Sequence, residues 1–300
     1  MIPIHSILAA TDFSTGAAKA VRRAIQLATE HGAGMELLHV ISGPGLKAIR
    51  ELFGAPQQVE AGLAEDANHR LHNLARRVAR QTGTLPQTQV RSGKVAEEII
   101  ATAESTDLLI MGARGSTALR DVFLGTTTDR VLHKCPRPVL IVKRPALTPY
   151  ENVLVPIGHG PTSALAVRLA ARLAPHADMT VLHAFSVPFE ARLNLAGVAQ
   201  DDIDRYRLDA RHEAVRHVDS ILRDVDIGDR LVRRSIEPGE APRLILRREK
   251  ELGADLIVIG KHGDSLLDVM FLGSVTRHII GGSKCDVLVV GEEAEQQTLT

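Results

Sequence analysis

The chain carries the same glycine pattern, Gly-x2-Gly-x9-Gly, twice. Its members are Gly112, Gly115 and Gly125 in the first half and Gly260, Gly263 and Gly273 in the second. Every pair is separated by 148 residues, and in both copies an apolar run precedes the first glycine and another follows the last. A constant offset with matching flanks indicates an internal duplication, so the 300 residues are predicted to form two similar domains.

The expected domains occupy residues 1–144 and 151–291. A linker containing two prolines joins them at 145–150, and a loose tail follows at 292–300. In each half, strand-sized apolar runs alternate with segments of helical periodicity. The first half is expected to hold strands at 6–11, 35–41, 88–91, 108–111 and 139–142, with helices at 17–31, 59–80, 95–103 and 125–133. The second half is expected to hold strands at 153–155, 179–184, 231–235, 256–259 and 287–290. This alternation predicts an α/β fold in which a mostly parallel sheet has helices on both faces.

The glycine pattern follows the fourth predicted strand, where ligands of open parallel sheets bind. Gly112 and Gly115 would allow a positive φ and let backbone N–H groups approach a phosphate. Gly125 precedes a helix whose first N–H groups and threonine hydroxyls would donate to the same anion. Arg114 would add a charge-assisted contact, and Asp12 would accept from a ribose or base edge. Each feature alone is also typical of ordinary turns and caps; the complete set favours a nucleotide.

The complete pattern, with Asp12 at the end of the first strand, resembles the universal stress protein family. Leu38-His39-Val40, the segment 91–100 and the last apolar run of each half support the resemblance. It implies two tandem, doubly wound domains, each with a five-stranded parallel sheet of order 3-2-1-4-5. It also implies binding of ATP, with or without Mg²⁺. In the family, Val40 would offer its backbone to adenine and Asp12 would contact the nucleoside. The positions that carry over are Ala10, Thr11, Asp12, Val40, Met111, Gly112, Arg114, Gly115, Gly125, Thr126, Thr127 and Thr128.

The second copy lacks part of this pattern. Gly158 stands in place of Asp12, and Ile157 in place of Thr11. A weaker second site is therefore expected, with His159 or His183 as an alternative partner for the nucleoside. Its residues would be Gly260, His262, Gly263, Gly273, Ser274, Val275 and Thr276.

The functional prediction is a nucleotide-responsive stress or regulatory module. Neither a Walker lysine motif nor a nucleophile–base pair accompanies the glycine loop, so no catalytic residue is predicted. The histidine spacing suggests no metal site. The alternative is a slow ATPase, or an autophosphorylating protein that uses a loop hydroxyl such as that of Thr126.

Charge and hydropathy bear on partners and location. The 36 basic and 36 acidic side chains cancel, which gives no reason to expect nucleic acid or a membrane as partner. The apolar runs are far shorter than the about 20 residues of a membrane span, and the first residues do not resemble a secretion signal. A cytoplasmic location is expected. By resemblance, the last strands of the two halves would pair within the chain as a pseudo-dimer, and a homodimer remains open.

Overall fold

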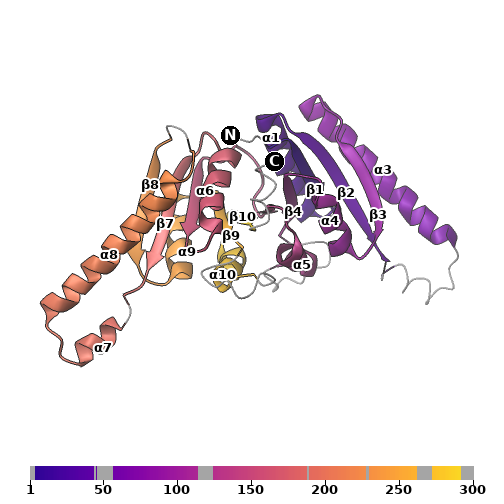
Figure 1. The fold of residues 1–300 in the computed structure, drawn as a ribbon. Helices are drawn as coiled ribbons and strands as arrows, with labels where there is room; N and C mark the ends of the chain where they lie inside the picture. Colours follow the sequence, from indigo (N-terminus) through magenta and orange to yellow (C-terminus); the bar gives the residue numbers. More distant parts are fainter. Residues whose placement is uncertain are drawn as a thin grey trace. The chain divides into compact units, whose positions relative to one another are not determined.

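Each half of the chain folds around its own parallel sheet (Figure 1). The computed structural model describes residues 4–43, 45, 57–113, 124–187, 189–227, 230–261 and 272–291. The chain divides into two units, Ile2–Pro149 and Tyr150–Val290. We call them the first and the second unit. Among the residues described, no helix is both long and apolar enough to cross a membrane.

The strands of the first unit lie in the order β3-β2-β1-β4-β5. Their bounds are β1 Ser6–Ala10, β2 Gly34–Ser42, β3 Gln87–Gly93, β4 Leu108–Gly112 and β5 Val139–Val142. Nearly every residue of β1, β4 and β5 is buried and apolar, which is typical of parallel strands covered on both faces. The predicted fold class and strand order are confirmed, and the boundaries fall within one or two residues of expectation.

The helices formed by the described residues lie on the two faces of this sheet. They are α1 (Thr15–His31), α3 (Gln57–Thr82), α4 (Val95–Ala103) and α5 (Thr126–Lys134). The strand order reverses direction after β3, so right-handed crossovers place α1 and α3 on one face and α4 and α5 on the other. The contacts agree, since α1 packs against α3 and α4 against α5. Ser14 caps α1 by accepting the Ala17 N–H at 3.2 Å, and Gly32 ends it at φ 63°.

The second unit repeats the order as β8-β7-β6-β9-β10. Its strands are β6 Asn152–Ile157, β7 Asp178–Phe185, β8 Val232–Pro238, β9 Leu256–Gly260 and β10 Asp286–Val290. Its helices are α6 Thr162–Leu173, α7 Glu190–Leu195, α8 Gln200–Arg223, α9 Ala241–Leu252 and α10 Ser274–Gly282. The short helix α7, which contacts α8, was not predicted.

One repeated contact explains the acidic residue before the fourth strand of each half. Asp107 Oδ2 accepts the backbone N–H groups of His5 and Ser6 at 2.8 and 2.9 Å. Asp255, at the same repeat position, accepts those of Glu151 and Asn152 at 2.8 and 3.2 Å. Each carboxylate therefore aligns the first strand of its unit beside the fourth.

Candidate functional site

The start of α5 lies at the carboxyl edge of the first sheet, beside the ends of β4 and β5. The Ala113 N–H donates to Val142 O at 3.2 Å, and the Gly125 N–H donates to Ala113 O at 3.0 Å. Gly125 occupies the N-cap position, and α5 has no side-chain cap. The first N–H groups of α5 are therefore left for another acceptor, whereas Ser14 supplies the cap of α1. Such a helix start favours an anion.

The three threonines that open α5 are not equivalent. Thr126 is exposed and Thr127 is partly exposed, while Thr128 is buried. The Thr128 hydroxyl donates to Gly112 O at 3.2 Å. In the second unit the Thr276 hydroxyl donates to Gly260 O at 2.7 Å. We expected all three hydroxyls to face a phosphate; the third instead ties the helix to the end of the strand.

Gly112 also differs from expectation. It does not adopt a positive φ. A Cβ at this position would lie 2.8 Å from the carbonyl carbon of Gly16 and 2.9 Å from its oxygen, in the first turn of α1. Real Cβ atoms do not approach backbone so closely, so glycine is needed here because α1 lies directly against the end of β4. The neighbouring Met111 is buried and pairs with Ile141 of β5.

The nucleoside end of the predicted site lies where β1 ends. Ala10 and Thr11 are buried, and the Thr11 N–H donates to Leu38 O at 2.8 Å. Asp12 is exposed, and its Oδ1 accepts the Ser14 N–H at 3.0 Å. The carboxylate therefore takes part in the turn, as the capping alternative predicted. A carboxylate has acceptor positions for more than one donor, so this contact is compatible with nucleoside binding.

The polar backbone groups of Val40 face the side of β2 on which β1 lies. Residues two apart in a strand turn their N–H and C=O groups to the same side. Leu38 turns its C=O toward Thr11, so Val40 turns its polar backbone to that side as well. The β1–β2 ladder ends at the pair Ala10 and Leu38, so the Val40 groups point past the end of β1. A base edge can be recognised there by backbone hydrogen bonds.

The turn after β1 contains a cluster that the sequence did not predict. Phe13 has φ 61°, which is rare for a bulky residue. Its ring centroid lies 4.5 Å from that of His39 and 4.2 Å from Cζ of Arg70 on α3. His39 Nδ1 lies 2.8 Å from Thr11 O, which fixes this turn against β2.

Four predicted site residues lie outside the described residues, and their positions stay predictions. They are Arg114 and Gly115 in the first copy and His262 and Gly263 in the second. The remaining site residues of the first unit gather at the carboxyl ends of β1, β2 and β4 and at the start of α5.

The second unit repeats the helix-start geometry. Gly273 precedes α10, donates to Lys261 O at 2.9 Å, and leaves the helix without a side-chain cap. Ser274 is exposed and Val275 partly exposed. A cavity of about 990 Å³ extends from Gly260 and the first turn of α10 to Gly158 and His159 after β6. It therefore joins both ends of the predicted second site.

Three histidines gather at the end of this cavity where Gly158 replaces the carboxylate. The ring of His159 lies 4.3 Å from that of His217 and 5.4 Å from that of His183, centroid to centroid. His183 Nδ1 lies 3.0 Å from Ile157 O, and His217 Nε2 lies 2.9 Å from Gly158 O. His217 was missed because it comes from α8, far from the motif. Its only signal is that it shares a helix face with the buried Ala214 and Ile221. Among the described histidines, cysteines and acids, no group of three or more is arranged to hold a metal ion.

Comparison with known proteins identifies the family. The sequence profile of the universal stress protein family matches residues 3–143 and again 149–291. The chain belongs to this family. A universal stress protein of Mycolicibacterium smegmatis is 27% identical over 304 residues, which cover 95% of this chain and 97% of that protein. Universal stress protein MJ0577 of Methanocaldococcus jannaschii is 32% identical over 154 residues, covering 46% of this chain and 94% of that protein.

A solved structure supports the fold over nearly the whole chain. A universal stress protein from Archaeoglobus fulgidus superposes with a TM-score of 0.66, covering 95% of this chain and 98% of that one. Its sequence is 19% identical, so the likeness concerns the fold alone. With the two profile matches, it establishes a tandem universal stress protein.

Proposed function

We propose that the first unit of this universal stress protein binds an adenine nucleotide, ATP, and that the bound nucleotide makes the chain a responsive regulatory module. One observation carries the proposal. The uncapped start of α5 and the outward-facing backbone of Val40 lie at the same edge of one sheet. The first suits phosphates and the second suits a base edge. Asp12, between them along the edge, would accept from the ribose or the base. Mg²⁺ would come with the phosphates, since nucleotide-bound magnesium is held largely by phosphate oxygens and water.

We propose that the second unit binds the nucleotide more weakly. Its cavity and its uncapped α10 are suited to phosphates. Its nucleoside end presents the imidazoles of His159, His183 and His217 in place of a carboxylate. Loss of one charged hydrogen bond costs about 1.5–3 kcal/mol, or about ten- to a hundredfold in affinity.

A pair of matched variants tests both statements. Thr126→Asp and Ser274→Asp each place a carboxylate at the exposed first position of α5 or α10. The new charge repels phosphate, while an acid at a helix start stabilises the helix, so both variants should fold. The full chain is purified, denatured, and assayed for released adenine nucleotide. We expect about one nucleotide per chain in the wild type and in Ser274→Asp, and a loss of most of it in Thr126→Asp.

The other outcomes are informative. Two nucleotides per chain would overturn the predicted weakness of the second unit. If Ser274→Asp lost its nucleotide and Thr126→Asp kept it, the assignment of the stronger site to the first unit would be reversed. No released nucleotide, followed by no binding on titration with ATP, would refute nucleotide binding altogether. ADP in place of ATP would favour the slow ATPase.

A further inference from the structure

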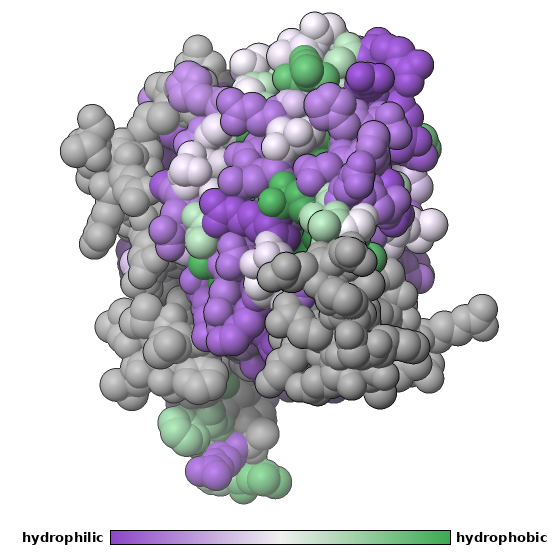
Figure 2. Space-filling view, turned by 90° about the vertical axis from the view of Figure 1, so that its right-hand side faces the viewer, coloured by the Kyte–Doolittle hydropathy of each residue, from purple (hydrophilic) through white to green (hydrophobic). Residues whose placement is uncertain are grey.

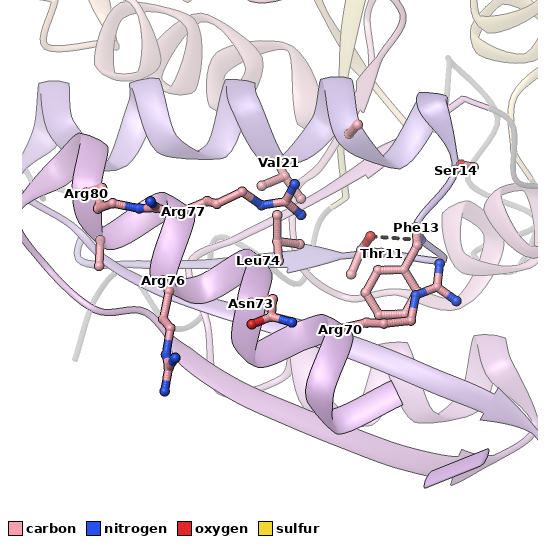
Figure 3. A pocket seen from close by; sticks show the side chains of 12 residues that line it. Thr11, Phe13, Ser14, Val21, Arg70, Asn73, Leu74, Arg76, Arg77 and Arg80 are labelled. Atoms are coloured by element: carbon pink, nitrogen blue, oxygen red, sulfur yellow. Dashed lines mark hydrogen bonds between the residues drawn. The ribbon is translucent and has the colours of Figure 1, made fainter. Parts of the chain in front are cut away.

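A groove on the first unit lies between α1 and α3 and is lined by arginines, and no described residue of α5 lines it. It has a volume of about 930 Å³. Arg70, Arg76, Arg77 and Arg80 of α3 line it, and none of the described residues around it is acidic. Figure 3 shows Arg77 reaching from α3 toward Val21 of α1, with Arg80 beside it, while Arg76 points away from α1. Figure 2 shows the side of the molecule that carries α3, and its coloured surface is mainly hydrophilic.

Most of the charges in this groove have no acidic partner among the described residues. Arg70 lies 3.7 Å from Asp66. Arg76, Arg77 and Arg80 make no ion pair with any residue that the structure describes. From residue 67 to residue 82 the helix contains no acid at all. Several unpaired guanidinium groups on one helix face create a positive potential that an anionic ligand would relieve.

The second unit offers an internal comparison. The corresponding long helix α8 also carries arginines, but acids of the same helix accompany them. Arg205 pairs with Asp202, and Arg207 pairs with Asp204 at 2.8 Å. Asp219 of α8 pairs with Arg234 of β8. Arg205 and Arg207 of α8 therefore form ordinary surface ion pairs, whereas Arg77 and Arg80 of α3 have no acidic partner among the described residues.

The groove suits linked phosphates better than nucleic acid. A guanidinium binds phosphate through two parallel hydrogen bonds. Arg70 and Arg80 are ten residues apart on α3, a separation of about 15 Å along the axis, so the ligand should carry charge over that length. Single-stranded nucleic acid also requires aromatic rings on which bases stack. The ring of Phe13, the aromatic side chain among the described lining residues, is already in contact with Arg70 and His39.

We infer that this groove is a binding site for a linear chain of linked phosphates without a base, held by Arg77 and Arg80 and extended by Arg70. The groove shares Thr11 with the proposed nucleotide site, and the rest of its lining comes from the turn after β1 and from α1 and α3. The inference does not depend on nucleotide binding.

The test is calorimetric titration of the full chain with linear inorganic polyphosphate long enough to span the groove. The variant Arg77→Gln/Arg80→Gln removes the charges of two exposed side chains and keeps most of their length. We expect its affinity to fall by about tenfold, because one exposed ionic contact contributes a factor of up to about five. Binding to the wild type should also weaken as salt is raised.

The control is Arg205→Gln/Arg207→Gln on α8, which removes the same charge from the other unit and should leave the affinity unchanged. Thr126→Asp should keep polyphosphate binding, and Arg77→Gln/Arg80→Gln should keep its nucleotide content, so each proposal can fail without the other. Equal losses in the two double variants would overturn the inference, since binding would then follow net charge alone. So would displacement of polyphosphate by single-stranded DNA at the same phosphate concentration.

Discussion

At the scale of single residues, Gly112 gives the sharpest prediction. Its missing side chain lets the first turn of α1 lie against the end of β4. Gly112→Ala should lower the stability of the first unit by about 1–3 kcal/mol, because overpacking a close contact forces the backbone apart. Chemical unfolding followed by circular dichroism measures the loss.

The matched control is Gly62→Ala. Gly62 lies within α3, and a Cβ there would meet nothing within 4 Å. This substitution should stabilise by about 0.5–1 kcal/mol, since alanine is the better helix former. Two glycine-to-alanine changes in one unit are thus expected to have opposite signs. If Gly112→Ala left the free energy of unfolding unchanged, the contact between α1 and the end of β4 would not be tight.

The same residues show where sequence reasoning reaches its limit. The motif placed Gly112 and Thr128 at the predicted site, and in the structure the two residues are in contact at the end of β4. Their roles depend on a contact with Gly16 and on a buried hydroxyl bond, and these follow from packing that the spacing does not encode. Residues from distant elements, such as Arg70 and His217, could not be assigned to the sites, because nothing in a motif says which helix will cover it.

At the scale of elements, Glu237 at the end of β8 holds α9. It pairs with Arg247, and Arg248 Nε lies 2.6 Å from its Oε1. Partial burial by itself would raise the pKa of the Glu237 carboxyl. Hydrogen bonds from Ser235 and Arg248, with the charges of both arginines, outweigh that effect, so the pKa lies below its usual value. Because the pKa is lower in the folded protein, the ionised carboxyl stabilises the fold when the pH is above the pKa of the unfolded chain, about 4.3. This stabilisation is lost as the pH falls through the pKa of the folded state.

We therefore expect Glu237→Gln to destabilise the second unit at pH 7, and the difference from wild type to shrink steadily at more acidic pH. Urea unfolding followed by tyrosine fluorescence, repeated from pH 7 to acidic pH, measures the difference in unfolding free energy between the variant and the wild type. Glu240→Gln serves as the control, since Glu240 and its partner Arg243 are largely exposed and such pairs contribute little. A difference that stayed constant with pH would show that the carboxylate charge is not what holds α9.

The elements themselves were the most predictable part of the molecule. Continuous apolar runs such as Val139–Val142 leave little choice but a buried strand, and the helix expected at 17–31 is α1, Thr15–His31. The short helix α7 was not predicted, because one turn and a half carries too little periodicity to stand out.

At the scale of the whole molecule, the two units share a fold, but their unfolding can be followed by different spectroscopic signals. The chain contains no Trp and two Tyr, Tyr150 and Tyr206, both in the second unit. Tyrosine fluorescence therefore follows the second unit, whereas circular dichroism follows both. If ATP binds the first unit, a concentration about a hundredfold above Kd should stabilise that unit by about 2.7 kcal/mol.

The expected result is that ATP moves part of the dichroism transition upward and leaves the tyrosine transition in place. Thr126→Asp should abolish the shift. A tyrosine transition that moved in parallel would contradict separate responses of the two units. Pairing between the last strands of the two halves stays a prediction, as does the expected cytoplasmic location.

The segment between Ala113 and Gly125 has fixed ends. Its two ends are held together by the Gly125 N–H on Ala113 O and by the Thr128 hydroxyl on Gly112 O, whatever lies between them. The second unit closes its own segment in the same way, through Lys261 and Gly260. Closing a somewhat longer or shorter loop costs little once its ends are fixed. In each unit, therefore, the contacts that fix the start of α5 or α10 do not involve the residues between these ends, so substitutions within the segment should leave the helix start in place.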